Sequence, residues 1–124
     1  MAGDAGDTNG NPYYQSLWQH CAGLPEAVED HPWGETVFKV RGKVFAFLGA
    51  PGGAVVTVKA APDDGEALLA LPFIRRAAYV GRFGWVTVAI EDDDALDLAL
   101  DLVTRSHELV SQPRRSSRKR AAEQ

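Results

Sequence analysis

The spacing of hydrophobic residues changes along the chain between a helical period and a strand-like alternation. Intervals of three and four residues predict a first helix from Pro12 to about Leu24 and a longer last helix from Asp92 to Gln112. A short helix is predicted over 62–71, where Asp63 and Asp64 lie favourably at the positive end of the helix dipole. The buried stripe of the first helix is Tyr14, Leu17, Trp18 and Cys21.

Short segments of alternating or β-branched residues lie between these helices and predict strands. Arg41-Gly42 is expected to join two of them in a tight hairpin, because glycine adopts positive φ without strain. Residues 73–84 are expected to form a loop. This order of elements predicts a two-layer α+β domain, an antiparallel sheet with helices on one face. The predicted strands are 26–30, 36–41, 43–48, 54–59 and 85–90.

Alternation within the strands also predicts which side chains face away from the helices. In the strand 36–41, Phe38 and Val40 are expected in the core, so Val37, Lys39 and Arg41 face outward. The other outward residues predicted in the same way are Val55, Thr57, Lys59, Trp85, Thr87 and Ala89, with Lys43 at the hairpin tip. Cations beside an aromatic ring and hydroxyls favour a platform for phosphates and bases. Lysines that only solvate a wet sheet face are the alternative.

Trp85 is the largest side chain expected on this outward face. A large aromatic ring in that position requires cover from a loop or from a ligand. The favoured expectation is that the loop 73–84 folds over it, for example through Tyr79, and a stacked base is the alternative.

Charge is distributed unevenly along the chain, whose formal net charge is −4. Residues 114–124 carry five basic groups against Glu123, which leaves residues 1–113 with 8 basic and 16 acidic groups, a net charge of −8. An acidic body argues against strong general binding of nucleic acid, so any basic footprint is local. The candidate nucleic-acid contacts are Lys39, Arg41, Lys43, Lys59, Arg82, Trp85, Arg114, Arg115, Arg118, Lys119 and Arg120.

Composition predicts one soluble domain over residues 12–113, between a disordered segment 1–11 and a flexible basic tail 114–124. The tail is either an arm that neutralises phosphates or a solubilising end. No apolar run reaches the length of a membrane span, and the acidic start does not resemble a signal peptide. We therefore expect a cytoplasmic monomer that does not contact membranes.

No catalytic or metal-binding pattern stands out in the sequence, so neither an enzyme nor a cofactor is expected. The acidic run 91–94 lacks the spacing of a calcium loop, and helix capping explains it. Ser106 and His107 are neighbours on a predicted helix and point about 100° apart, which disfavours a catalytic pair. Cys21 lies on an apolar stripe and is expected to be a buried, inert thiol.

Three motifs in order, LPEAVED (24–30), HPWGETVFKVRGKVFAFLG (31–49) and RSHELV (105–110), resemble the MmcQ/YjbR family. The resemblance runs from about Cys21 to Val110. It implies a small α+β fold, compared with secretion chaperones and with frataxin, and a role in binding DNA. It also leaves open a protein-interaction module that binds a basic protein partner, or a small-molecule or metal-binding enzyme. His107 stands where the family commonly has tyrosine, so any role of that tyrosine does not transfer to this chain.

Overall fold

A computed structural model describes residues 11–49, 54–77 and 84–112, without the side chain of Trp33. Helices and strands follow one another in the order expected from the sequence, with one added strand. The elements are α1 (Pro12–Ala22), β1 (Ala27–Asp30), η2 (Pro32–Gly34), β2 (Thr36–Val40), β3 (Lys43–Gly49), β4 (Ala54–Lys59), η3 (Pro62–Asp64), α2 (Gly65–Leu69), β5 (Ile74–Arg76), β6 (Trp85–Ile90) and α3 (Asp93–Ser111).

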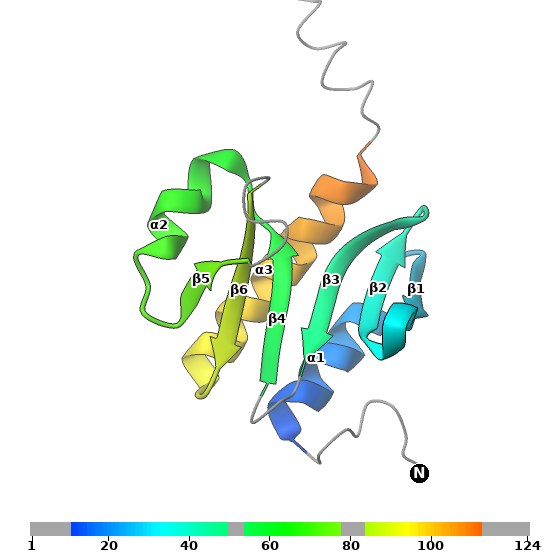
Figure 1. Cartoon of the computed structure of the whole chain (residues 1–124), viewed down its shortest axis with the longest axis horizontal. Coiled ribbons are helices and arrows are strands. Elements are labelled where there is room, and N and C mark those ends of the chain that lie inside the picture. Colours follow the sequence, from blue (N-terminus) through cyan, green and yellow to red (C-terminus); the bar gives the residue numbers. More distant parts are fainter. Residues whose placement is uncertain (1–10, 50–53, 78–83, 113–124) are drawn as a thin grey trace, which may run out of the picture.

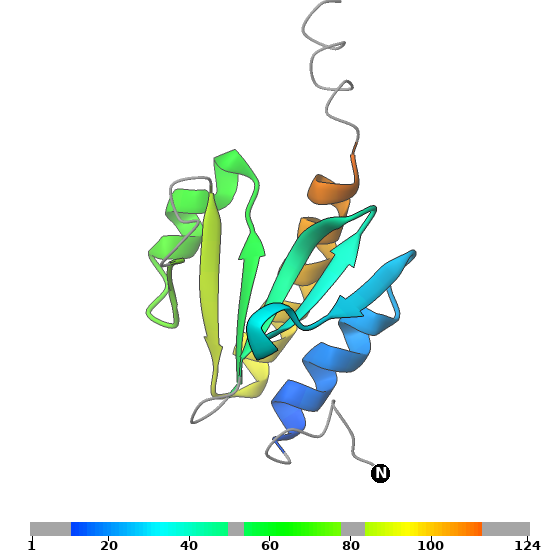
Figure 2. The same ribbon diagram turned by 45° about the vertical axis from the view of Figure 1, so that its right-hand side comes forward.

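The strands form one antiparallel sheet in the order β1-β2-β3-β4-β6-β5. Helices α1 and α3 lie side by side on one face of this sheet, as Figures 1 and 2 show, and α3 packs across β3, β4 and β6. The short helix α2 packs beside β5 at one end of the sheet. The predicted two-layer α+β fold is confirmed, with its helices on one face.

Side chains cap both long helices where the sequence placed their starts. The Asn11 carboxamide oxygen accepts hydrogen bonds from the backbone N–H groups of Tyr13 and Tyr14, at 2.8 and 3.2 Å. The Asp92 carboxylate accepts one from the N–H of Ala95 at 2.8 Å. A carboxylate or amide oxygen at this position satisfies N–H groups that have no partner within the helix. Capping therefore accounts for Asp92, as the sequence predicted.

The β2–β3 hairpin turns at Arg41 and Gly42, which have φ angles of 55° and 82°. Two successive positive φ values match the right-handed twist of the flanking strands, which explains glycine at the second position. The predicted hairpin is confirmed.

The prediction of a loop over residues 73–84 is wrong at Ile74–Arg76, which forms the edge strand β5 against β6. Ile74 is buried and pairs with Val88, whereas Arg75 pairs with Thr87. Three residues are too few to show an alternating pattern, so only pairing with β6 reveals this strand. The predicted helix over 62–71 is likewise divided into a 3-10 turn, η3, and the five-residue α2.

A β-bulge, one extra residue in β3, turns the ring of Phe45 into the core, next to the ring of Phe38. The partners of Phe38 and Lys39 on β3 are Ala46 and Val44, so Phe45 is a bulge residue between them. Phe45 is fully buried, and its ring lies edge-on to the His107 ring on α3, with centroids 5.0 Å apart. The bulge thus places both Phe45 and Ala46 among buried residues.

Cys21 of α1 is fully buried, and this desolvation raises the pKa of its thiol to about 12. We expect iodoacetamide at pH 8 to leave Cys21 unmodified in the native protein, because only about one thiol in ten thousand is then ionised. Mass spectrometry before and after adding urea measures this, and the urea sample should be fully alkylated. Native alkylation at the rate of an exposed cysteine would contradict the burial of this side chain.

Candidate nucleic-acid interface

The sheet face opposite α1 and α3 carries a row of side chains that crosses all six strands. Strand register aligns one residue from each strand at the same level. The row consists of Asp30, Val37, Phe47, Thr57, Thr87 and Arg75. We call the sheet surface that contains this row, together with Lys39, Lys59 and Trp85, the outward face.

Two residues predicted to face outward, Val37 and Thr87, are nevertheless buried, with 0% and 6% of their surface exposed. Val37 lies between Asp30 and Phe47 in the row, and Thr87 lies between Thr57 and Arg75. Small side chains between larger neighbours on adjacent strands lose their contact with water. The sequence therefore predicted correctly which side of the sheet these two residues face, but it did not predict that their side chains are buried.

Two aromatic rings pack together on the outward face. Phe47 of β3 and Trp85 of β6 have ring centroids 5.7 Å apart and planes at 71°, an edge-to-face contact. Both side chains are only partly buried. Beside them the hydroxyls of Thr57 and Thr87 share a hydrogen bond of 2.8 Å. The sequence did not identify Phe47 as a neighbour of Trp85, because β4 separates their strands. The predicted cover of Trp85 by Tyr79 lies outside the described residues.

Lys59 pairs with Trp85 in the strand register, so it stands next to the aromatic pair. Its backbone is fixed from the helix layer by Ser106, whose side chain is fully buried. The Ser106 hydroxyl accepts a hydrogen bond from the N–H of Lys59 at 3.0 Å and donates one to the carbonyl of Phe45 at 2.7 Å. This hydroxyl bridges β3 and β4 directly beyond their last paired residues, Ala46 and Val58.

His107, the residue after Ser106, points elsewhere. Its Nε2 atom lies 2.7 Å from the carbonyl oxygen of Pro25. Both side chains are therefore engaged in holding α3 to other elements, and they do not contact each other. The two side chains thus point to different partners, as their neighbouring positions on one helix predicted.

Lys39 and Arg41 are both in ion pairs within the protein. The Lys39 ammonium lies 2.8 Å from the Asp30 carboxylate, and the Arg41 guanidinium lies 3.6 Å from Glu26. The hydrogen bond from Lys39 is the main reason that the pKa of Asp30 is lowered. Because Asp30 stays ionised, Lys39 is partly neutralised and offers less charge to a phosphate than the sequence suggested.

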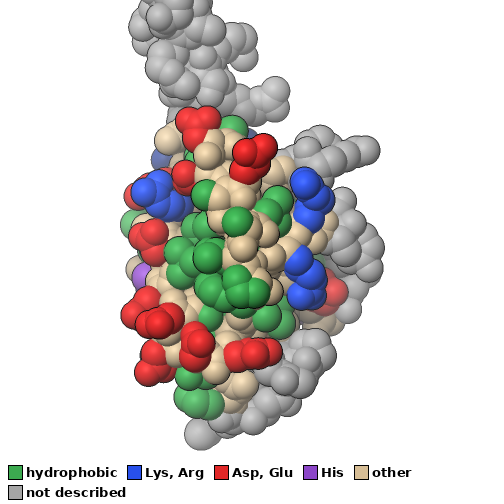
Figure 3. Space-filling model, turned by 90° about the vertical axis from the view of Figure 1, so that its left-hand side faces the viewer, with side chains coloured by type: hydrophobic (Ala, Val, Ile, Leu, Met, Phe, Trp, Pro, Cys, Tyr) green, Lys and Arg blue, Asp and Glu red, His purple; other side chains and the backbone are tan. Residues whose placement is uncertain are grey.

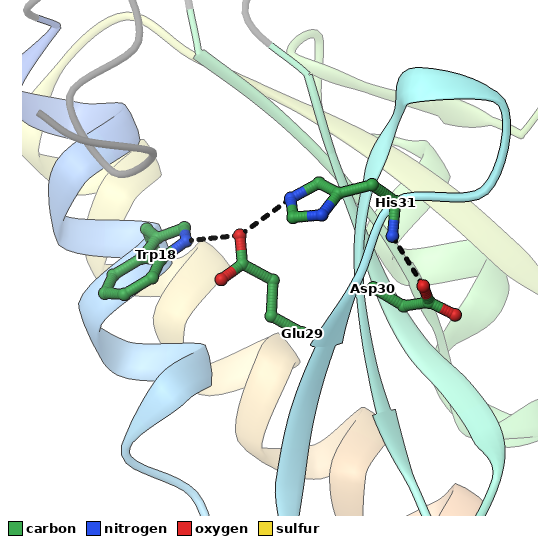
Figure 4. A network of polar contacts seen from close by, with 4 residues as sticks. All are labelled: Trp18, Glu29, Asp30 and His31. Carbon is green, nitrogen blue, oxygen red and sulfur yellow. Dashed lines mark hydrogen bonds and ion pairs between the residues drawn. The ribbon is translucent and has the colours of Figure 1, made fainter.

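The carboxylates of β1 also form a small polar network, drawn in Figure 4. Glu29 accepts a hydrogen bond from the indole N–H of Trp18 at 3.1 Å, and the same oxygen lies 2.9 Å from Nε2 of His31. Asp30 accepts one from the N–H of His31 at 2.8 Å. These contacts tie α1 to β1 and the turn after it. The residues that the structure describes contain no group of three or more His, Cys, Asp or Glu side chains that could hold a metal ion.

The remaining predicted nucleic-acid contacts are Lys43, Arg82 and the basic tail. Lys43 is exposed at the start of β3, with no ion pair among the described residues. It pairs with the core residue Val40, so its predicted place on the outward face is wrong, because the two-residue turn puts both side chains on the helix side of the sheet. Arg82 and the tail residues 114–120 lie outside the described residues. Arg75, which the sequence placed in a loop, joins the outward face through β5 and is exposed.

Charges separate between the two layers of the described structure. Every described lysine and arginine except Arg105 lies on a strand or in the β2–β3 turn. Most described carboxylates instead lie on or just before η3, α2 and α3. Figure 3 views the molecule from the side of α2: acidic side chains gather mainly along the left margin, with one basic group among them, and the other basic side chains stand toward the right. None of the described helices is long and apolar enough to cross a membrane.

Comparisons with known proteins agree with this architecture. A family model described as YjbR matches residues 22–109. The Deinococcus radiodurans protein DR2400, described as domain DUF419, is 27% identical with a TM-score of 0.69, covering 77% of this chain and 76% of that chain. A Pseudomonas syringae protein is 22% identical with a TM-score of 0.61, covering 77% of this chain and 97% of that chain, a likeness of fold alone. No curated protein matches.

Proposed function

This chain belongs to the YjbR family, and we propose that it is a non-enzymatic, cytoplasmic protein that binds nucleic acid through its outward face. The separation of charge between the layers carries the proposal. Lys39, Lys59 and Arg75 on the outward face attract phosphates, and the carboxylates of the helix layer repel them, so the outward face is the side that approaches the ligand. The charge separation therefore determines which face of the protein turns toward a nucleic acid, which the net charge alone does not.

Lys59 and Arg75 are the central cations of this interface. Lys59 stands beside Trp85, and Arg75 ends the row that crosses the sheet. Neither has an ion pair among the described residues, so each is available to a phosphate oxygen. Arg41 extends the surface at the hairpin, whereas Lys43 pairs with the core residue Val40 and lies on the helix side of the sheet. Arg82 and the tail 114–120 would add contacts. The body charge of −8 keeps the affinity weak, and the contacts between cations and phosphates make it salt-dependent.

Fluorescence anisotropy with labelled single-stranded and double-stranded DNA tests the proposal. We expect binding in the micromolar range at low salt that weakens steadily as salt is added. Absence of salt-dependent binding to either form at tens of micromolar protein would refute nucleic-acid binding.

Lys59→Ala should flatten the plot of log affinity against log salt by about 0.7–0.9, the value for one lost phosphate contact. Lys39→Ala should change the slope less, because Asp30 already neutralises much of that charge. Arg105→Ala, on the helix layer, is the matched control and should leave the slope unchanged or slightly steeper. Equal effects of the Lys39 and Lys59 substitutions would contradict the role given to Asp30.

A second candidate function follows from the acidic helix layer. Asp94, Asp97 and Glu108 are exposed on α3 and have no ion pair among the described residues, a surface suited to a basic protein partner. A pull-down from lysate with and without nuclease separates the two functions. A partner retained after nuclease treatment, and lost from an Asp97→Lys variant, would support the protein-interaction role.

A further inference from the structure

We infer that the outward face takes an unpaired nucleic-acid strand, whose bases stack on Phe47 and Trp85. This inference rests on the proposed function and names the ligand class of the same site. It starts from the aromatic pair, an observation separate from the charge distribution that supports the function.

The edge-to-face contact between the two rings keeps aromatic surface available to a ligand. At 71° between planes, one ring presents its edge to the face of the other, so neither ring is sandwiched by its partner. Both rings extend from strands that are paired on both sides, β3 with β2 and β4, and β6 with β4 and β5. Their positions are therefore fixed by the sheet before a ligand arrives, and little conformational entropy is lost on binding.

Only an unpaired base can use such rings. In a duplex the base faces are already stacked on one another, and the grooves show base edges alone. An unpaired base offers its face, and stacking on an aromatic side chain contributes to affinity with little dependence on sequence. Sheet-face aromatics that bind two or three unpaired bases are an arrangement used by RNA recognition motifs.

Polar groups around the two rings suit the parts of a nucleic-acid strand other than its bases. Thr57 lies on β4, between the two strands that carry the rings, and its hydroxyl shares a hydrogen bond with that of Thr87 on β6. Lys59 stands beside Trp85, and Arg75 lies on the far side of β6 from Phe47. From β3 to β5 there are three strand intervals, which is about 14 Å at the usual strand spacing. Cations beside the aromatic pair suit a short single strand of nucleic acid whose bases face the rings and whose phosphates lie toward the cations.

The test compares an oligothymidylate of about 15 nucleotides with a duplex of the same length, at one salt concentration. We expect the single strand to bind at least about ten times more tightly. Trp85→Leu and Phe47→Leu should each weaken single-strand binding by about 5- to 150-fold and leave the salt slope unchanged. Trp85→Phe, which keeps a ring, should retain most of the affinity, and thermal melting of each variant confirms that it is folded.

The outcomes separate the two levels of the proposal. Equal binding of single strand and duplex, or folded leucine variants with unchanged affinity, would overturn the stacking inference and leave nucleic-acid binding in place. If neither ligand binds at low salt, the proposed function fails and the inference fails with it. A loss of affinity in Trp85→Leu that Trp85→Phe does not restore would also overturn stacking.

Discussion

Phe45→Ala is expected to lower the free energy of unfolding by about 3–5 kcal/mol, the usual cost of removing a large buried aromatic side chain. Phe45 is fully buried, and its ring contacts the rings of Phe38 and His107. It is also the bulge residue of β3, so its ring fills the space between the sheet and α3 at a fixed position. Neighbours held by the bulge cannot easily move in to fill the cavity.

Urea denaturation followed by circular dichroism measures this loss. Phe47→Ala is the matched control, since Phe47 lies two residues along the same strand and is only partly buried on the opposite face. We expect it to cost about 1–2 kcal/mol, because less apolar surface leaves water on folding. Similar losses for the two substitutions would contradict the assignment of Phe45 to the core side of the sheet.

Ser106→Ala is expected to lower the free energy of unfolding by about 2–4 kcal/mol, because it leaves one buried and one part-buried backbone group without this hydrogen-bond partner. The carbonyl of Phe45 loses its hydrogen-bond donor, and the N–H of Lys59 loses its acceptor. The substitution removes a single oxygen atom, so lost packing contributes little. Hydrogen exchange at the amide of Lys59 should also accelerate, because that amide is protected through the serine.

Ser111→Ala provides the control on the same helix. The Ser111 hydroxyl donates only to the carbonyl of Glu108, near the exposed end of α3, so its loss should change stability by less than about 0.5 kcal/mol. Unchanged stability of Ser106→Ala, with normal protection of the Lys59 amide, would mean that β3 and β4 can close on each other without the bridging hydroxyl.

Residues near one another in the chain determined much of this fold. The period of the hydrophobic residues placed α1 and α3, and the alternation in β2, β4 and β6 predicted which residues face the helices. The Arg41-Gly42 turn and the Asp92 cap depend on backbone angles and hydrogen bonds within a few residues. Such features can be read locally because the interactions that stabilise them are local.

The candidate interface was predicted less completely, because its residues meet through strand pairing. Lys59 and Trp85 were assigned to the correct face, but no local pattern indicates that Asp30 pairs with Lys39 or that Phe47 contacts Trp85. Arg75 joined the interface only through β5, a strand too short to show a pattern. The residues within a strand do not indicate which other strand pairs with it in the sheet.

Local sequence thus determined the elements and the faces of the regular strands, since period and turn chemistry act over a few residues. Tertiary structure decided the bulge that turns Phe45 into the core, because simple alternation would place it with Phe47 on the outward face. It also decided the role of Ser106, whose hydroxyl reaches from α3 to backbone groups of β3 and β4. Both depend on how closely α3 packs on the sheet, a property of the whole assembled core.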